Sequence, residues 1–244
     1  MKIIQVNIWH GKLMHPIKHF IRDQKPDFVC MQEVNDMPGE SGSMFFTLDE
    51  LRNLSHMKYS YMSPTHSYKY MHRRADFGNA TLCNIEPADK KTIFTGGEYN
   101  TDTDFDEDDV VALRNFQHLT FQISGKTLNI INTHGLWVED GKNGNLETQR
   151  QMTQIADYIK RLEGPVIFCG DLNLKPSSPS LVPFNFLQNL AAENNLICTY
   201  QPSVSNQTDV CDYIFVSKGI KVNKFEMAEK LISDHKALVL DFDL

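Results

Sequence analysis

Long apolar runs are missing from this sequence. No stretch approaches the ~20 apolar residues that a membrane-spanning helix requires. The first residues, MKIIQVNIWHG, do not contain the long apolar segment of a secretory leader, so no signal peptide is expected. We therefore expect a soluble cytoplasmic protein, unless a leader was removed ahead of residue 1. A chain of 244 residues can bury a sizeable core, and we expect a single domain over residues 1–244.

Cysteine is scarce, and no two cysteines have the CxxC spacing of a metal or redox pair. An odd count without such pairs argues against a disulfide framework and against a structural zinc site. Four of the five lie in or beside apolar runs, which predicts buried free thiols in a reducing compartment. The five are Cys30, Cys83, Cys169, Cys198 and Cys211.

An excess of positive charge is also lacking, since the formal net charge is −7. This balance argues against a surface dedicated to gripping DNA or RNA. It leaves room for a local basic groove, or for a bound cation that bridges an acidic site to a phosphate.

Much of the negative charge is concentrated in TDTDFDEDD, residues 101–109, which carry six carboxylates. Mutual repulsion predicts an exposed connecting segment. A second hypothesis is that Asp106, Glu107, Asp108 and Asp109 border a functional site and oppose the approach of polyanions.

The most informative stretch is VIFCGDLN, residues 166–173. Its apolar first half predicts a buried strand that stops at Gly170. Asp171 and Asn173 then stand at the carboxyl end of the strand, where ligands usually bind in sheets covered by helices. A carboxylate can take a proton from water, and an amide can donate to an oxyanion. Asp and Asn are also common turn residues, so on this segment alone the two interpretations are equal.

Strands outnumber helices along the rest of the chain, and helices interrupt them at intervals. Helices are predicted over residues 16–24, 44–55, 145–162 and 184–194. Strands are predicted over residues 2–8, 27–34, 58–62, 76–85, 92–97, 110–123, 127–133, 166–169, 196–200, 211–217, 222–228 and 235–242. This order favours an α/β fold with two sheets packed together and helices outside.

Polar residues recur at the ends of these apolar strands. Each one alone has a simpler explanation as a turn former, a solvated strand end or a buried histidine. Their repetition at six strands makes that explanation much weaker for the set. The set comprises Asn7, Glu33, Asn132, His134, Asp171, Asn173, Asp212, Asp234 and His235.

The residue types in this set suit a hard divalent cation such as Mg²⁺, which takes carboxylate and amide oxygens. Glu33 is the best candidate ligand, with support from Asp234 or Asn7. His235 has no second histidine or cysteine at zinc spacing, so a catalytic role fits it better than a structural one. Asp212 could orient the His235 ring through its N–H, as carboxylates do for catalytic imidazoles.

Six short motifs then occur in order: QEV at 32–34, GNA at 78–80, NTH at 132–134, GDLN at 170–173, DYIF at 212–215 and SDH at 233–235. Together they resemble the endonuclease/exonuclease/phosphatase superfamily of metal-dependent phosphoesterases, and FGNATL resembles its FGNA-type bacterial branch. The resemblance implies a four-layer α/β sandwich, in which two packed mixed β-sheets are flanked by helices.

The resemblance also implies a role for each matching residue. Glu33 would be the principal Mg²⁺ ligand, with Asn7 and Asp234 close to the metal, and Mn²⁺ could replace Mg²⁺. Asp171 would position or deprotonate the attacking water, while Asn173 holds a phosphate oxygen. The remaining site residues would be His235 on the phosphate, Asp212 as its orienting partner, His134 as a second histidine and Arg114 as a phosphate-binding arginine.

Three further residues are predicted to contact substrate. Asn79 in the GNA motif would approach the phosphate, although an amide that stabilises a turn explains it nearly as well. Trp9 and Trp137 follow two of the strands that carry site residues and could stack on a base. Burial in the core is the commoner outcome for a tryptophan.

These observations lead to the expectation of a monomeric Mg²⁺-dependent hydrolase that acts on phosphate esters. The substrate would be a nucleic-acid phosphodiester or a small phosphorylated metabolite. The alternative is a catalytically silent member that binds a partner through the same fold. A silent scaffold need not retain Glu33, Asp171, Asn173, Asp212 and His235 together.

Overall fold

The computed structural model describes residues 1–37, 47–70, 73–103, 112–139 and 141–244. Within the acidic segment, residues 104–109 lie outside the described residues. The hypothesis that Asp106, Glu107, Asp108 and Asp109 form an acidic rim therefore stays a prediction. Among the described residues, no helix is both long and apolar enough to span a bilayer.

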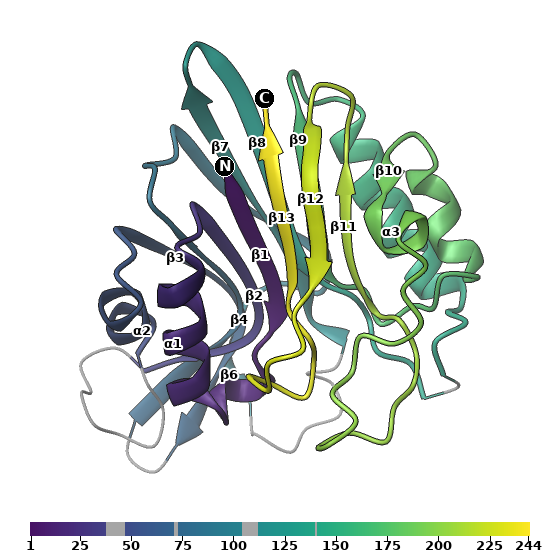
Figure 1. Ribbon diagram of the computed structural model, residues 1–244. Helices are drawn as coiled ribbons and strands as arrows, with labels where there is room; N and C mark the ends of the chain where they lie inside the picture. Colours follow the sequence, from purple (N-terminus) through teal and green to yellow (C-terminus); the bar gives the residue numbers. More distant parts are fainter. Residues whose placement is uncertain (38–46, 71–72, 104–111, 140) are drawn as a thin grey trace.

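Two mixed β-sheets form the centre of the molecule (Figure 1). The first sheet has the strand order β12-β13-β1-β2-β4-β3-β6, in which β1 pairs in parallel with β2 and antiparallel with β13. Its strands are β1 (Lys2–Asn7), β2 (Phe28–Asp36), β3 (Tyr59–Tyr70), β4 (Arg73–Cys83), β6 (Asn100–Thr103), β12 (Lys221–Met227) and β13 (Leu238–Asp243).

The second sheet has the order β10-β11-β9-β8-β7-β5. Strands β8 and β9 are parallel, and the other neighbouring pairs are antiparallel. The strands are β5 (Asp89–Gly96), β7 (Arg114–Ile123), β8 (Lys126–His134), β9 (Val166–Asp171), β10 (Gln188–Asn189) and β11 (Asp212–Val216).

Apolar side chains fill the space between the two sheets. Phe28 of the first sheet packs edge-on against Phe121 of the second, with ring centroids 4.8 Å apart. Cys30 and Cys169 are buried in the same cluster as free thiols. The prediction of buried, unpaired cysteines is confirmed for Cys30, Cys83, Cys169 and Cys211.

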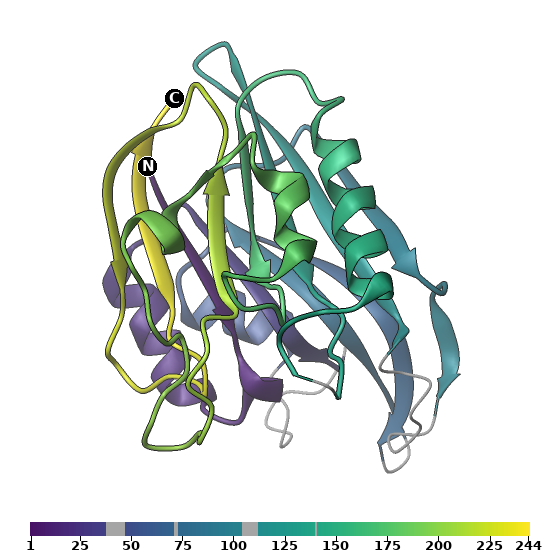
Figure 2. The same cartoon turned by 90° about the vertical axis from the view of Figure 1, so that its right-hand side faces the viewer.

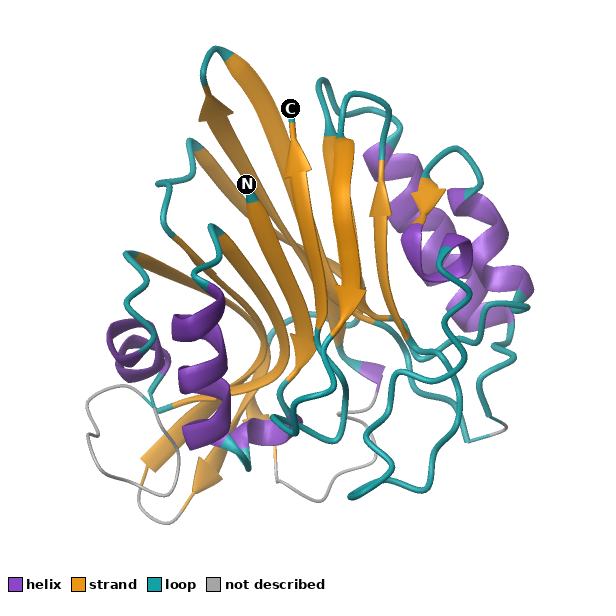
Figure 3. Cartoon of the chain, viewed as in Figure 1, coloured by secondary structure: helices purple, strands orange, loops and turns teal. Residues whose placement is uncertain are grey.

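Helices cover the outer face of each sheet, which gives four layers (Figures 2 and 3). The first sheet is covered by α1 (Met14–Gln24) and α2 (Leu48–Leu54), and the second by α3 (Leu146–Ile159), η3 (Pro179–Phe184) and α4 (Leu190–Glu193). Helix α3 begins with a capping box, because Asn145 accepts from the Thr148 N–H while the Thr148 hydroxyl accepts from the Asn145 N–H. The predicted α/β sandwich with two packed mixed sheets is confirmed.

Several predicted elements differ from the structure. The helix predicted over 184–194 is wrong: a two-residue strand at Gln188–Asn189 pairs with β11 and leaves only the short α4. The strand predicted over 196–200 is reduced to a single bridge between Tyr200 and His235. Strand β3 runs to residue 70, far beyond the predicted 58–62, and the pairing of β6 with it was not predicted.

Candidate active site

Strand register in the second sheet brings three predicted site residues side by side. His134 of β8 is the register partner of Asp171 on β9, and Asp171 is the register partner of Asp212 on β11. Register partners on neighbouring strands point to the same face of a sheet. The ends of three adjacent strands therefore present an imidazole and two carboxylates together.

Close backbone contact at this edge explains two glycines. A Cβ at Gly170 would collide with the carbonyl oxygen of Thr133, and a Cβ at Gly135 would collide with that of Leu172. Only glycine allows the backbones of β8 and β9 to approach so closely just where the site residues leave the sheet.

The first sheet contributes Asn7 from the end of β1 and Glu33 from within β2, which continues to Asp36. The pairing of β2 with β4 shifts register between Met31 and Val34, and Glu33 lies in this irregularity with φ of 54°. A β-bulge re-aims the side chain that it carries, and positive φ in a non-glycine residue is strained. Asn173, just after β9, also has positive φ, at 55°. Both strained residues point into the site.

The two sheets are joined at this edge by the amide of Asn7. Its Nδ2 donates to Oε1 of Glu33 at 2.9 Å and to Oδ2 of Asp171 at 3.0 Å. Burial opposes ionisation of Asp171, but His235 and His134 outweigh it and hold the pKa of Asp171 below its usual value. Burial likewise opposes ionisation of Glu33, but His134 and His10 hold the pKa of Glu33 below its usual value. Both groups are carboxylates at neutral pH.

His235 is held by Asp212, as the sequence predicted. Nδ1 of His235 lies 2.8 Å from Oδ2 of Asp212, and the other oxygen of Asp212 accepts from the buried amide of Gln5 at 3.0 Å. Burial disfavours the charged ring, but the adjacent Asp212 and Asp171 carboxylates raise the pKa of His235 to about 10. His235 is therefore an imidazolium at neutral pH, with Nε2 3.7 Å from Oδ2 of Asp171.

His134 has the opposite character. Burial and the nearby Arg114 guanidinium lower the pKa of His134 to about 4. Its ring is neutral at pH 7, so the contacts of 3.6 Å to Asp171 and 4.0 Å to Glu33 are not ion pairs at that pH. The edge of the site thus combines one charged histidine and one neutral histidine around Asp171.

Asn173 is fixed by three partners. Its Nδ2 lies 3.0 Å from Nε2 of His134 and donates to the Gly135 carbonyl at 3.2 Å, while its Oδ1 accepts from Nζ of Lys142. A lysine can only donate, so this contact identifies which end of the amide is oxygen. Both amide hydrogens of Asn173 are thus engaged by the protein, and the predicted donation to a phosphate oxygen is not available in this arrangement.

Arg114 is 8% exposed and is aimed by two backbone carbonyls. Nε donates to Gly135 and Nη1 to Leu113, each at 2.9 Å. Burial lowers the pKa of Arg114 to about 10, while Glu33 and Asp171 favour its charged form. Nη2 has no hydrogen-bond partner among the described residues, so it can serve a ligand.

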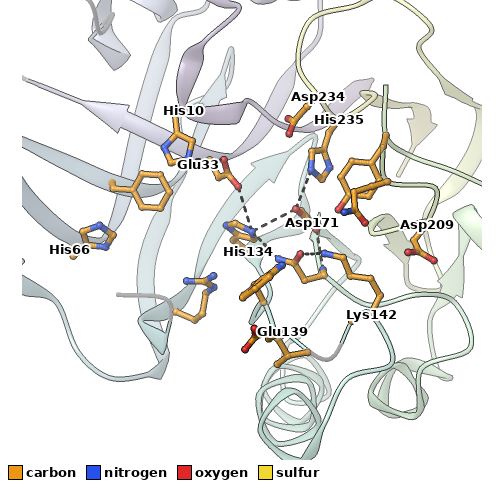
Figure 4. Close-up of a pocket in the computed structure, with 18 of the residues that line it drawn as sticks. His10, Glu33, His66, His134, Glu139, Lys142, Asp171, Asp209, Asp234 and His235 are labelled. Atoms are coloured by element: carbon orange, nitrogen blue, oxygen red, sulfur yellow. Dashed lines mark hydrogen bonds and ion pairs between the residues drawn. The ribbon is translucent and has the colours of Figure 1, made fainter. Parts of the chain in front are cut away.

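These side chains line one cavity of about 670 Å³ (Figure 4). Of the predicted site residues, Glu33, Arg114, His134, Trp137, Asp171, Asn173, Asp234 and His235 line it. Asn7 and Asp212 lie directly behind it, at 1% and 0% exposure, and act through the side chains they bond.

Two predicted substrate contacts do not reach the cavity wall. Asn79 is buried, and its Nδ2 donates to the backbone and side chain of Asn115, each at 3.0 Å. Trp9 is half-buried, with Nζ of Lys12 lying 4.0 Å from its ring centroid. Trp137 is 50% exposed and does line the cavity.

The cavity residues that were not predicted from the sequence include His10, His66, Lys142 and Tyr200. His10 follows Asn7 closely in the WHG segment, and its Nε2 lies 3.2 Å from Oε2 of Glu33. The Tyr200 ring packs on the His235 ring with centroids 4.4 Å apart. Only His10 had a local signal, namely its position just after a strand that carries a site residue.

Oxygen-rich groups at this edge provide two places for a metal ion. Asp171, Asp212 and His235 each offer one ligand atom, and these atoms lie within 4.8 Å of one another. Both oxygens of Asp212 already accept hydrogen bonds, which lessens its capacity as a ligand. Glu33 and Asp234 present carboxylates to the cavity, and this donor set suits a hard cation.

The sequence model of the endonuclease/exonuclease/phosphatase family matches residues 4–235, from β1 to His235. The chain belongs to this family. The match covers every residue of the site described above. No curated protein matches the chain.

Solved structures of the family share the fold over the whole chain. An endonuclease/exonuclease/phosphatase of Bacteroides vulgatus is 19% identical with a TM-score of 0.74, covering 100% of this chain and 98% of that one. A mannosyl-6-phosphatase of Bacteroides thetaiotaomicron is 13% identical with a TM-score of 0.73, covering 100% of both chains. TDP2 of D. rerio, complexed with a single-strand DNA product, is 15% identical with a TM-score of 0.69, covering 100% of this chain and 99% of that one.

Proposed function

We propose that this protein is a Mg²⁺-dependent hydrolase of phosphate esters that uses an activated water. The observation that carries the proposal is the position of Asp171. This carboxylate lies in a cavity between the cationic His235 and the Asn7–Glu33 pair, with its pKa held low. The substrate would be a nucleic-acid phosphodiester or a small phosphorylated metabolite.

Asp171 is suited to take a proton from water. Oδ1 accepts the Asn173 backbone N–H at 3.0 Å and Oδ2 accepts the Asn7 amide at 3.0 Å, so the carboxylate is held in one orientation. A positioned base contributes about 10²–10⁴-fold to a rate.

Three cationic groups surround the space in front of Asp171. They are His235, Arg114 and Lys142, and all three line the cavity. Hydrolysis of a phosphate ester builds negative charge on oxygen, and preorganised donors stabilise that charge. Asp212 orients the His235 ring, and the amide oxygen of Asn173 orients the Lys142 ammonium group.

Glu33 and Asp234 would hold the cation. The predicted ligand Asn7 would act through the carboxylates that its Nδ2 bonds, because its amide oxygen already accepts the Trp9 backbone N–H at 3.0 Å. Mg²⁺ prefers such oxygen ligands, and Mn²⁺ could replace it. When bound, the ion would supply positive charge to phosphate oxygens. The chain's own contribution is to keep Glu33 ionised in a half-buried position, through His10 and the Asn7 amide.

The proposal is tested by turnover of p-nitrophenyl phosphate and bis-p-nitrophenyl phosphate with Mg²⁺, with Mn²⁺ and with EDTA. We expect metal-dependent hydrolysis that falls at least ~10²-fold in Asp171→Asn, because the base is lost. Asp157→Asn on the exposed face of α3 is the matched control and should retain full activity. Circular dichroism must show native folding in both variants.

A broader panel then decides between an enzyme and a silent binding module. It comprises abasic DNA, single-stranded DNA, RNA, tyrosyl DNA, inositol phosphates and sphingomyelin. If neither wild type nor Asp171→Asn shows metal-dependent turnover of any member, the silent scaffold is the better account.

A further inference from the structure

A second functional group lies in the same cavity, away from Asp171. His66 of β3 is 6% exposed and lines the cavity. In Figure 4 it lies on the opposite side of His134 from Lys142. None of the metal-binding, base and phosphate-binding roles proposed above involves His66.

The hydrogen bonds of Thr65 define the tautomer of His66. Thr65 Oγ1 lies 3.0 Å from Nδ1 of His66 and donates to the Phe77 carbonyl at 3.1 Å. A hydroxyl has one hydrogen, so both bonds form together only if Nδ1 carries the proton and donates to Thr65. Nε2 of His66 is then a bare acceptor, and it has no hydrogen-bond partner among the described residues.

The ring remains neutral at physiological pH. Burial, and after it the charges of Arg114 and His10, lower the pKa of His66 to about 4. The lone pair on Nε2 is therefore open to a donor in the cavity.

Aromatic rings pack around His66. The Phe77 ring lies 5.2 Å from it, and Phe77 is in turn stacked on His10 at 5.1 Å. The Tyr68 ring lies 6.2 Å away, and its hydroxyl donates to Asn35 at 2.7 Å. When a ligand fills this part of the cavity and displaces water, Nε2 of His66 needs a donor from the ligand. A buried acceptor without a donor costs free energy.

A metal ion does not explain this acceptor. Among the described residues, the cluster of three carboxylate and histidine groups with ligand atoms within 4.8 Å of one another is Asp171, Asp212 and His235, and His66 is not part of it. Arg114, whose positive charge acts on His66, would repel a cation there.

We propose that this end of the cavity is a subsite for a free hydroxyl on the alcohol portion of the substrate, which donates to Nε2 of His66. A hydroxyl can donate to His66 and accept from the guanidinium of Arg114 with one oxygen. An ammonium group can only donate and would be repelled by Arg114. The proposal rests on the proposed phosphate-ester hydrolysis and selects esters of sugars, polyols or nucleosides over simple aryl esters.

Two matched pairs of esters test the subsite. Glucose-6-phosphate is paired with phenyl phosphate, and the p-nitrophenyl ester of thymidine monophosphate is paired with bis-p-nitrophenyl phosphate. In each pair only the first member carries a free hydroxyl. A site that binds a substrate hydroxyl discriminates strongly against a missing one, so His66→Leu should lower kcat/KM for the first member by at least ~10-fold more than for the second.

Two further variants give the experiment its controls. His66→Gln can place an oxygen acceptor near the position of Nε2 and should recover most of the loss. His118→Leu removes a buried histidine that does not line the cavity, and should affect both members of a pair alike. Equal losses within each pair for His66→Leu would overturn the subsite.

Nitrogen-15 NMR of the wild-type protein tests the proposal without turnover. Nδ1 of His66 should have the chemical shift of a protonated ring nitrogen and Nε2 that of an unprotonated one. A proton on Nε2 would overturn the proposal even if every His66 variant fails to fold. If wild type cleaves none of the four esters, the proposed hydrolysis fails on those substrates, and the NMR result still decides the state of His66.

Discussion

One nitrogen of Asn7 donates to two carboxylates that belong to different sheets, Glu33 at 2.9 Å and Asp171 at 3.0 Å. Asn7 and Glu33 come from the first sheet and Asp171 from the second. The bond joins the layers at the edge where the cavity opens. It also holds one buried and one half-buried negative charge near each other, which favours a cation beside them.

This arrangement predicts that Asn7→Ala destabilises the metal-free protein. Loss of the amide leaves two carboxylate oxygens without their shared donor, and such a loss costs about 1–3 kcal/mol. Urea unfolding in EDTA measures the change in the free energy of unfolding. Asn223→Ala, which removes an exposed bond to Asp243, should change it by less than ~0.5 kcal/mol. Similar losses in the two variants would contradict the bridging role.

A second prediction concerns the proposed metal ligand. Glu33→Gln keeps the size of the side chain and one of its two acceptor oxygens but removes its charge, so Mg²⁺ affinity and activity should both fall. Titration calorimetry measures the affinity, with exposed Glu229→Gln as the control. If Glu33→Gln binds Mg²⁺ as tightly as wild type, the cation is held elsewhere, and the Asp171, Asp212 and His235 group becomes the next candidate.

The sequence was sufficient to predict much of the site because several of the family motifs lie at strand ends. His134, Asp171 and Asp212 each close or open an apolar strand, and three neighbouring strands bring them together by register alone. Glu33 shows the limit of such reasoning. The place of Glu33 in an apolar strand that carries the QEV motif was predictable, but the bulge that aims its side chain was not.

The parts that could not be predicted depend on long-range pairing. A strand was predicted only over residues 58–62, and Pro64, which follows closely, is a residue type unfavourable inside a strand. A register shift between Pro64 and His66 accommodates the proline, and the strand continues to carry His66 to the cavity. Similarly, local apolar spacing after Phe184 favoured a helix, but pairing of Gln188 and Asn189 with β11 overrides it.

A third prediction follows from the charge state of His235. Its pKa is raised in the folded protein to about 10 from an ordinary value of 6.5. The charged ring therefore contributes stability that is fully present below about pH 6.5 and is lost as the pH rises through about 10. NMR titration in EDTA should show a protonated His235 ring at pH 8.

Asp212→Asn tests the cause of that shift. Removal of the carboxylate should lower the pKa of His235. The loss of stability between about pH 6.5 and about pH 10 should then be smaller. The value of kcat should also fall, because the ring loses its orienting partner. Asp241→Asn, on the exposed side of β13, should leave the titration unchanged. An unaltered His235 pKa in Asp212→Asn would show that other groups hold the proton.

The last prediction assigns phosphate binding to Lys142 rather than to Asn173. Both amide hydrogens of Asn173 are engaged by His134 and Gly135, and its oxygen receives Lys142. The lysine is therefore the group that this part of the cavity offers to an anion. Lys142→Met should raise KM roughly 10-fold or more, since a hydrogen bond to a charged group contributes about 1.5–3 kcal/mol.

The size of this effect should depend on substrate charge and salt. A phosphate monoester carries more negative charge than a diester, so its KM should rise more in Lys142→Met. Because Lys142 is partly exposed, the difference from wild type should shrink as salt rises and shortens the screening length, which is about 10 Å at 0.1 M. Lys160→Met, at the exposed end of α3, provides the matched loss of one positive charge. If both lysine variants raise KM alike, the effect is one of net charge, and Lys142 has no specific contact with the phosphate.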